Sequence, residues 1–480
     1  MICIAGTEGE ALGVSQGGKA TPMKEEKQVL QENKMGVMPC NRLLLSMSVP
    51  MMISMLVQAL YNIVDSIFVA RISESALTAV SLAFPVQSLM IAIMTGTGVG
   101  INARLSKKLG ERNYESANHT AGNALLLSFC NMLFFILFGL LFTKMFFRAQ
   151  TNDEEIVHYG IQYLTVVTIL SGGFAFQITF ERLVQATGRT LYSMMSQGTG
   201  AIINIILDPI FIFGLFGFPK LGVTGAALAT VLGQWVAAGL GLYFNLHKNP
   251  DIRLAFRYLR PNRRIIEEIY AVGIPTIIMQ SIGSVMTFGM NKILIVFSST
   301  AAAVFGVYFK LQSFIFMPVF GLNNGVVPII AYNYGAHKPD RIKRVFKLAC
   351  MYAVGIMFIG MLLFQFGADQ LLTLFSASDK MIEIGRVALR TISLSFLFAA
   401  FNIVCSSIFQ ALGHGMLSLW VSVIRQLVVL LPAAFVLAKW EGLTAVWWAF
   451  PIAEIVAFTL SLIFLRHILK KEVEPLYRAA

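Results

Sequence analysis

The chain has 480 residues, of which 56% are hydrophobic and only 13% are charged, and its formal net charge is +12. Soluble domains carry about 25% charged residues, so this composition excludes a protein whose whole surface faces water. The basic residues lie in short segments between apolar runs, which is the pattern of a cytoplasmic membrane face and not of a nucleic-acid-binding surface.

The first 42 residues are polar and of mixed charge, and they lack the apolar run of a signal peptide. We expect residues 1–42 to form a disordered leader, with Met1, Met23 and Met35 as alternative start positions.

Twelve apolar runs follow the leader. Each is long enough to cross a hydrocarbon core of about 30 Å, and lipid offers no hydrogen-bond partner for free backbone groups, so each must be helical. The sequence therefore predicts an all-α integral membrane protein with twelve transmembrane helices. The expected spans are residues 43–70, 76–101, 121–142, 157–180, 191–215, 222–245, 268–297, 304–332, 346–367, 386–410, 416–438 and 443–469.

Lys and Arg gather in the even-numbered connections between these spans and in the C-terminal tail. The connection at residues 246–267 is rich in arginine, for example, whereas the third connection carries the acids Asp153, Glu154 and Glu155. The positive-inside rule then places both termini in the cytoplasm. We expect a multi-pass protein of the plasma membrane that acts as a monomer.

A repeat relates the two sets of six spans at a constant offset of 225 residues. The matched pairs are Pro50 and Pro275, Phe84 and Phe309, Gln87 and Gln312, Ser88 and Ser313, Gly96 and Gly321, Gly100 and Gly325, Gly110 and Gly335, Gln185 and Gln410, Ala186 and Ala411, and Gly188 and Gly413. Six is an even number, so the repeats are parallel and related by an axis along the membrane normal. The expected divisions are an N-terminal lobe at 43–245, a basic cytoplasmic linker at 246–267, a C-terminal lobe at 268–470 and a tail at 471–480.

The candidate ion site is a polar cluster in the N-terminal lobe. A charged carboxylate at mid-membrane costs at least about 2.5–3.5 kcal/mol, so Asp65 in the first span and Asp208 in the fifth attract notice. Asn204 precedes Asp208 by four residues and shares its helix face, and Thr230 adds a hydroxyl from the sixth span. Pro209 weakens the helix beside Asp208 and is the expected bending point.

Two carboxyl groups, an amide and a hydroxyl suit either a proton or Na⁺ as the coupling ion. A carboxyl group removed from water favours its neutral form and can exchange protons, and the same oxygens could bind Na⁺ at Asp65 and Asp208. The alternative is that each Asp only hydrogen-bonds neighbouring helices. The repeat argues against that alternative, because Asp65 corresponds to Met290 and Asp208 to Ala433, and a purely structural role would recur in both lobes.

The C-terminal lobe has a different polar set, with Glu454 in the twelfth span, Arg425 in the eleventh and Lys310 in the eighth. Glu454 could attract a cationic substrate, but we favour an ion pair with Arg425 or Lys310. Lys292 extends its amine toward the membrane surface. The candidate substrate-cavity residues are Tyr61, Gln58, Glu454 and Gln312.

The other motif classes do not occur. There is no Walker, GxSxG, HExxH or dinucleotide-binding pattern on a suitable element, so we expect neither an enzyme nor an ATP-driven pump and no cofactor. The five cysteines are scattered, and we expect neither a disulfide framework nor a metal site. Phe and Met are abundant and suit small lipophilic organic cations as substrates.

At these motifs the chain resembles the MATE (multidrug and toxic compound extrusion) family, most closely its MepA-type multidrug export branch. The resemblance covers residues 41–470 and is carried by the runs VPMMISMLVQALYNIVDSIFVARI, QATGR, NIILDPIFIFG, LGVTGAALAT, FKLQSFIFMPVFGLNNGVVPIIAYNYGA and QALGHG. It implies a V-shaped 6+6 fold and cation-coupled export of organic cations by alternating access. By motif, the residues that match the family's cation-coupling cluster are Asp65, Asn204, Asp208 and Thr230.

The alternative function is a lipid-linked oligosaccharide flippase of a related fold. A flippase needs a cationic cavity for a pyrophosphate headgroup, whereas the strongest cavity candidates in this sequence are acidic. The sequence therefore favours the export of cations, and the paired intramembrane acids also argue against a channel or a receptor.

Overall fold

The computed structural model describes residues 33–375 and 378–479. Residues 1–32 of the leader expected at 1–42 lie outside the described residues. A short helix, α1 (Lys34–Val37), precedes α2, which begins at Cys40, so the chain is already helical over part of the range assigned to the leader.

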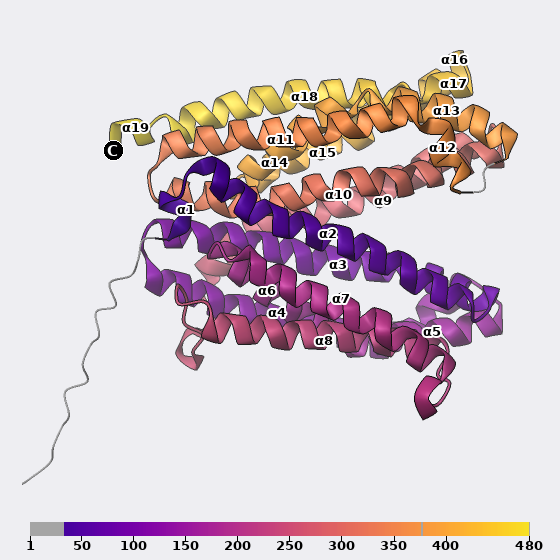
Figure 1. Cartoon of the computed structure of the whole chain (residues 1–480), viewed down its shortest axis with the longest axis horizontal. Coiled ribbons are helices and arrows are strands. Elements are labelled where there is room, and N and C mark those ends of the chain that lie inside the picture. Colours follow the sequence, from indigo (N-terminus) through magenta and orange to yellow (C-terminus); the bar gives the residue numbers. More distant parts are fainter. Residues whose placement is uncertain (1–32, 376–377, 480) are drawn as a thin grey trace, which may run out of the picture. The chain divides into compact units, whose positions relative to one another are not determined.

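The first half forms seven long helical segments (Figure 1). They are α2 (Cys40–Ala70), α3 (Glu74–Gly110), α4 (Tyr114–Arg148), α5 (Glu154–Ile169), α6 (Gly172–Ala186), α7 (Thr190–Phe213) and α8 (Val223–His247), with the single turns η1 (Leu215–Gly217) and η2 (Phe256–Tyr258) after α7 and α8.

The second half repeats this series with more interruptions. Its elements are α9 (Arg263–Ile295), α10 (Ser299–Gly335), α11 (Pro339–Phe366), α12 (Ala368–Thr373), α13 (Asp379–Ser393), α14 (Phe396–Ala411), α15 (Gly415–Val423), η3 (Ile424–Leu430), α16 (Leu431–Trp440), α17 (Leu443–Val446), α18 (Ala449–Ile468), η4 (Leu469–Val473) and α19 (Leu476–Ala479). No strand occurs in residues 33–375 or 378–479.

Among the described residues, ten helices are long and apolar enough to cross a membrane, and the number rises to twelve if each of two bent helix pairs is one span. The pairs are α5 with α6, bent by 44°, and α13 with α14, bent by 49°. The all-α fold with two sets of six membrane spans is thus confirmed.

The two bends occupy equivalent places in the repeat. One lies at Leu170 and Ser171 and the other at Leu394 and Ser395, so the positions match the 225-residue offset to within one residue. Serine and glycine cluster at the first bend, where Gly172 and its neighbour follow Ser171, and such residues are a known cause of kinks. Hydropathy alone did not reveal either break.

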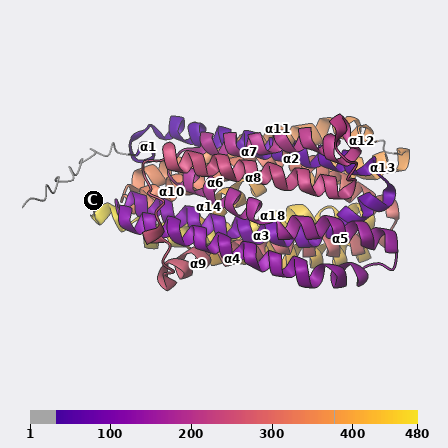
Figure 2. The ribbon, with the colours of Figure 1, turned by 90° about the horizontal axis from the view of Figure 1, so that it is seen from below.

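The two lobes meet through α2 and α3 of the first half and α9 and α10 of the second (Figures 1 and 2). The contacts pair α2 with α10, α3 with α9, and α3 with α10. In the repeat, α2 corresponds to α9 and α3 corresponds to α10. A two-fold rotation between the lobes therefore relates the α2–α10 contact to the α3–α9 contact and maps the α3–α10 contact onto itself.

Glycines found by the repeat lie at these contacts. A Cβ added at Gly96 would lie 2.5 Å from Cγ1 of Ile277, and one added at Gly321 would lie 2.5 Å from Cα of Met52. Ile277 and Met52 are themselves 225 positions apart. The repeated glycines therefore mark symmetric sites where the helix backbones approach closely.

A second glycine pair closes the end of the bundle where α1 and α19 lie, which we call the terminal end (Figure 1). A Cβ at Gly110 would lie 2.0 Å from the carbonyl oxygen of Tyr332, and one at Gly335 would lie 2.1 Å from that of Lys107. Tyr332 and Lys107 again differ by 225 positions, so each lobe contributes one glycine and one backbone carbonyl to this contact.

The segment before α2 is hydrogen-bonded to the first lobe through Asn33. The Asn33 amide donates to the carbonyl of Thr187 at 3.0 Å and to Oδ1 of Asp251 at 3.3 Å. Its side-chain oxygen also accepts from the backbone N–H of Met35 in the first turn of α1. Burial and the neighbouring Arg189 guanidinium lower the pKa of Lys34.

The same segment is hydrogen-bonded to the second lobe through backbone carbonyls. Asn333 and Arg341 both donate to the Met35 carbonyl at 3.0 Å, and Arg341 also donates to the Met38 carbonyl at 2.7 Å. Residues 33–38, which we call the strap, therefore join the two lobes at the terminal end.

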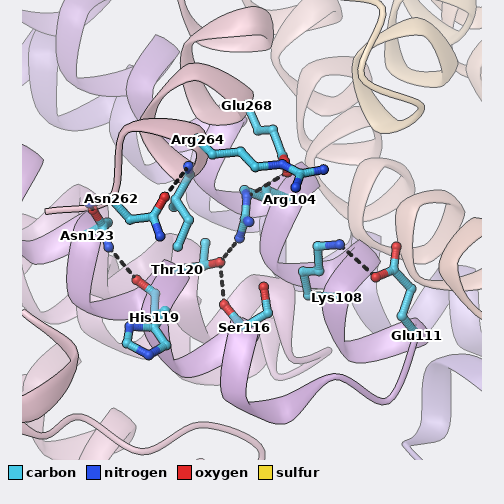
Figure 3. Close-up of polar contacts among 11 residues, drawn as sticks. Arg104, Lys108, Glu111, Ser116, His119, Thr120, Asn123, Asn262, Arg264 and Glu268 are labelled. Atoms are coloured by element: carbon cyan, nitrogen blue, oxygen red, sulfur yellow. Dashed lines mark hydrogen bonds and ion pairs between the residues drawn. The ribbon is translucent and has the colours of Figure 1, made fainter. Parts of the chain in front are cut away.

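The linker before α9 occupies the place in the repeat that the strap occupies before α2. It follows α8 of the first lobe and leads into the second, and its backbone amides at Arg253 and Asn262 donate to the side-chain oxygens of Asn118 and Asn123 on α4. Beside it, Nε of Arg104 on α3 pairs with Oε2 of Glu268 on α9 at 2.9 Å (Figure 3).

Candidate functional site

The predicted cluster in the N-terminal lobe is assembled from three helices. Asp65 comes from α2, Asn204 and Asp208 come from α7, and Thr230 comes from α8. The Asn204 amide donates to Oδ1 of Asp208 at 3.4 Å and to Oγ1 of Thr230 at 3.3 Å. The structure thus brings together the residues that the sequence singled out.

Local packing explains why α7 and α8 can place these groups side by side. A Cβ at Gly200 would lie 2.8 Å from the carbonyl of Gly233, and one at Gly233 would lie 2.6 Å from that of Gly200. The two backbones therefore touch one turn before Asn204. Asn204 is 3% exposed and Asp208 is fully buried.

Several acceptor atoms of this cluster are buried and have no hydrogen-bond partner among the described residues: Oδ1 of Asp65, Oδ2 of Asp208 and Oδ1 of Asn204. The two carboxyl groups are also close enough for their charges to interact. Two buried carboxylates with unsatisfied oxygens are strongly unfavourable unless a proton or a cation joins them. All the available ligand atoms are oxygens, which suit hard cations.

A small cavity of about 50 Å³ adjoins the cluster and is lined by Gln58, Tyr61, Asn204 and Thr230. Its volume suits one or two water molecules or a small ion, and it is far too small for a drug. Gln197 donates to Oε1 of Gln58 at 3.4 Å across this cavity.

One neighbour of the acids was missed by sequence reasoning. Tyr163 on α5 is buried, accepts a hydrogen bond from Gln87 at 3.0 Å, and interacts electrostatically with both Asp65 and Asp208. A lone tyrosine in an apolar run carries no sequence signal for such a role.

Pro209 lies inside α7, which continues to Phe213 and ends at Gly214, where φ is +75°. Proline cannot donate the backbone hydrogen bond that the helix requires at that position. The role of Pro209 as a bending point remains a prediction.

The C-terminal lobe has a much larger cavity, of about 920 Å³. It contains Glu454 and Gln312, whereas Gln58 and Tyr61 line the small cavity of the other lobe. The four candidate substrate residues therefore fall into two separate cavities. The large one is lined mainly by α9 and α10, with smaller parts from residues 84–89 of α3, from η3 and from α18.

Glu454 is paired within its own lobe. An Arg425 guanidinium nitrogen lies 2.7 Å from Oε1 of Glu454, and the Asn402 amide donates to Oε2 at 2.8 Å. Lys310, the other cation considered, is exposed. Arg425 and Glu454 are the charged pair in the lining of the large cavity.

Arg425 lies in η3, a π-helical segment between α15 and α16. The sequence predicted one uninterrupted span there. π-Helical turns are rare and frequently occur at functional sites, and this one places Arg425 and Gln426 on the cavity wall.

A buried polar network on α6 was also missed, because the expected fourth span ended at residue 180. Gln177 donates to Oε1 of Glu181 at 2.9 Å. Arg182 donates to Oε1 of Gln185 at 3.0 Å and, across the lobe boundary, to Oδ1 of Asn324 at 3.1 Å. The pair Glu181–Arg182 inside a continuing helix was the available signal.

No group of three or more His, Cys, Asp or Glu side chains suited to a metal ion occurs in the part of the chain that the structure describes. The free cysteines in that part of the chain are Cys40, Cys130, Cys350 and Cys405.

Comparisons with known proteins agree with this architecture. The family model described as MatE matches residues 50–210 and 275–436, two segments whose starts differ by the repeat offset. The multidrug export protein MepA of Staphylococcus haemolyticus is 29% identical over 419 residues, which cover 86% of this chain and 91% of that protein.

Solved structures match over nearly the whole chain. A multidrug resistance MATE family transporter of the MOP superfamily in an outward-facing conformation has a TM-score of 0.87 at 27% identity, covering 93% of this chain and 99% of that one. A MOP superfamily transporter from Pyrococcus furiosus, whose binding pocket is described as reversed in polarity, has a TM-score of 0.86 at 27% identity, covering 92% and 98%. The repeat, the six-plus-six helices and the match of both halves to one family model show that the chain belongs to the MatE family.

Proposed function

We propose that this chain is a secondary multidrug exporter that exchanges lipophilic organic cations for H⁺ or Na⁺ by alternating access. The observation that carries the proposal is the N-terminal cluster, in which Asp65 and Asp208 leave buried oxygens without partners. The MepA relative is named as a multidrug export protein, which supports the same substrate class.

The coupling ion would bind among Asp65, Asn204, Asp208 and Thr230. Protonation, or Na⁺ binding, would remove the uncompensated negative charge. The ion would therefore bind with different affinity to the inward-open and outward-open conformations of the transport cycle. Such a difference is what links one ligand to another in an antiporter. Bound H⁺ or Na⁺ and bound drug would then disfavour each other.

The substrate would occupy the large cavity. Phe309, Phe316 and Phe450 provide aromatic faces in its lining, and such faces attract organic cations. The acids beside the small cavity would act on the drug through the shared conformational change and not through contact.

The position of the large cavity relative to the lobe contacts supports one conformation of the transport cycle. Along α3 the cavity is lined by residues 84–89, whereas the close lobe contacts begin at Gly96 and continue to Gly110 at the terminal end. With both termini in the cytoplasm of a plasma-membrane protein, this arrangement is closed inward and open outward. Opening the terminal end requires the Arg104–Glu268 and Arg182–Asn324 contacts to separate.

The flippase alternative fits less well. A pyrophosphate headgroup needs excess positive charge, but Arg425 in the large cavity is paired with Glu454, and the small cavity has acids beside it.

The test is dye efflux. The protein is expressed in cells lacking their own exporters, and it is reconstituted in vesicles with an imposed pH or Na⁺ gradient. We expect efflux of lipophilic cationic dyes driven by one of the two gradients. Efflux that ignores both gradients would refute the antiport mechanism, and transport of a lipid-linked sugar without dye efflux would establish the flippase instead.

A further inference from the structure

A second cavity of the C-terminal lobe lies at the terminal end, away from the drug cavity. Its volume is about 500 Å³. It is formed by α9, by the start of α15 and by the end of α18 with η4, and its lining residues are Tyr270, Ala271, Ile274, Pro275, Gly413, His414, Met416, Leu417, His467, Ile468, Lys471 and Glu472. The transport mechanism uses none of them.

The repeat shows what fills the equivalent place in the N-terminal lobe. Gly188 and Gly413 correspond at the 225-residue offset, and both have positive φ, +84° and +88°. A Cβ at Gly188 would lie 3.2 Å from Cε of Lys34 and 3.2 Å from Cγ of Met35, so the strap covers this position. A Cβ at Gly413 would meet no described atom within 4 Å.

The surroundings of the two glycines are otherwise alike. Arg189, directly after Gly188, pairs with Asp251 at 3.4 Å, and His414, directly after Gly413, pairs with Glu472 at 3.4 Å. Each acid lies just beyond the sixth helix of its lobe. The two lobes therefore build the same small frame, and only the N-terminal frame is covered by a segment of this chain that the structure describes.

The uncovered cavity has an apolar wall and a basic rim. Ile274 and Met416 are about half exposed, and together with Pro275, Leu417 and Ile468 they give an apolar wall. At the rim, His467 and Lys471 line the cavity and are exposed, and the neighbouring Arg466 and Lys470 are exposed as well.

The acid in this cavity does not cancel the basic rim. Glu472 accepts a hydrogen bond from the Tyr334 hydroxyl at 2.6 Å and pairs with His414. Its carboxylate is thus held against the protein, while the amine of Lys471 and the ring of His467 remain at the opening.

We propose that this cavity binds one anionic phospholipid from the leaflet at the terminal end. The phosphate headgroup lies at Lys471 and His467, and an acyl chain covers Ile274, Pro275 and Leu417. Basic pockets between membrane helices on the cytoplasmic side recognise such headgroups, and a buried acyl chain adds about 0.8 kcal/mol per CH₂ group. The proposal requires only that the chain spans a bilayer, so failure of the proposed transport mechanism would not contradict it.

The test measures lipid retention by native mass spectrometry on the full-length protein from mixed phosphatidylglycerol and phosphatidylcholine vesicles. Two variants address the two parts of the site. Lys471→Gln with His467→Gln removes the lysine charge and the imidazole donor from the rim, and Ala271→Phe fills the apolar part without altering charge. Lys347→Gln, an exposed lysine on α11, is the matched control.

We expect the wild type and Lys347→Gln to retain one phosphatidylglycerol in preference to phosphatidylcholine. Lys471→Gln with His467→Gln should weaken retention about fivefold, the effect of one lysine near the membrane surface. Ala271→Phe should abolish retention, while a thermal denaturation midpoint equal to that of the wild type shows that the variant is folded. Equal retention of phosphatidylcholine, unchanged retention in Ala271→Phe, or displacement of the lipid by inorganic phosphate alone would each overturn the proposal.

Discussion

The two lobes share their framework but differ in what their interiors contain. Both have a bent fourth span, and both supply glycines to symmetric contacts. The N-terminal lobe holds Asp65 and Asp208, each with a buried oxygen that lacks a partner, beside a cavity of about 50 Å³. The C-terminal lobe pairs Glu454 with Arg425 in a cavity of about 920 Å³.

This difference shows which features follow from the fold and which from its use. Close helix contacts are needed in each lobe, so the glycines recur. Uncompensated acids cost free energy wherever they are buried, so we propose that the lobe that has them uses them. The N-terminal lobe would then sense the ion and the C-terminal lobe would hold the drug.

The largest expected effect distinguishes the acids of the two lobes. Asp65→Asn or Asp208→Asn mimics the protonated state permanently and should remove the link between ion and drug. Linked affinities commonly differ by about 5–150-fold, so gradient-driven dye efflux should fall to background at matched membrane expression.

Glu454→Gln is the comparison for these variants and should reduce efflux less, because Glu454 is ion-paired within its own lobe. Full efflux by both Asp variants would remove the N-terminal site from consideration. A greater loss from Glu454→Gln would move the ion site to the other lobe.

The second prediction tests the symmetry of the closed end. Gly110→Ala and Gly335→Ala each place a Cβ about 2 Å from a backbone carbonyl of the other lobe. Overpacking of this kind costs about 1–3 kcal/mol, and we expect the two variants to lower the thermal stability of the purified protein by similar amounts.

Gly198→Ala is the matched control, because a Cβ there has no described neighbour within 4 Å. It should be neutral or slightly stabilising, since alanine favours helix more than glycine. Strongly unequal effects at Gly110 and Gly335 would contradict a symmetric interface.

The third prediction concerns the ion pair of the C-terminal lobe. Arg425→Gln leaves the Glu454 carboxylate, which is 12% exposed, without its cation. We expect a loss of about 1–3 kcal/mol in stability, and a smaller loss when Glu454→Gln is added, because the double variant leaves no unpaired charge. A thermal denaturation series of the two single variants and the double variant measures this difference.

The smallest expected effect tests the strap. Asn33→Ala removes the hydrogen bonds to Thr187 and Asp251, and hydrogen bonds of this kind contribute about 0.5–1.5 kcal/mol each. The change should favour opening of the terminal end, so a cysteine-reactive probe should label the buried Cys40, at the start of α2 beside the strap, faster. Unchanged labelling would show that the strap only packs against the lobes and does not help hold them together.

Much of the fold was predictable because its causes are local or periodic. Twelve apolar runs predicted the spans, and the 225-residue offset paired glycines that the structure then places at the lobe interface. The spacing of Asn204 and Asp208 also predicted a shared helix face correctly, because one helical turn determines it.

The parts that could not be predicted depend on contacts between distant segments. Hydropathy treats a span as one run, so it did not reveal the bends at Ser171 and Ser395 or the π-helical turn at Arg425.

The sequence by itself determined the membrane class, the two-fold repeat and the asymmetry of the acids, because composition, periodicity and residue identity are properties of the chain alone. Only the tertiary structure decided that residues 33–38 join the lobes, that Arg182 reaches Asn324, and that the candidate substrate residues divide between two cavities. These features arise where segments separated by more than a hundred residues meet, and their energies depend on distances that no local pattern encodes.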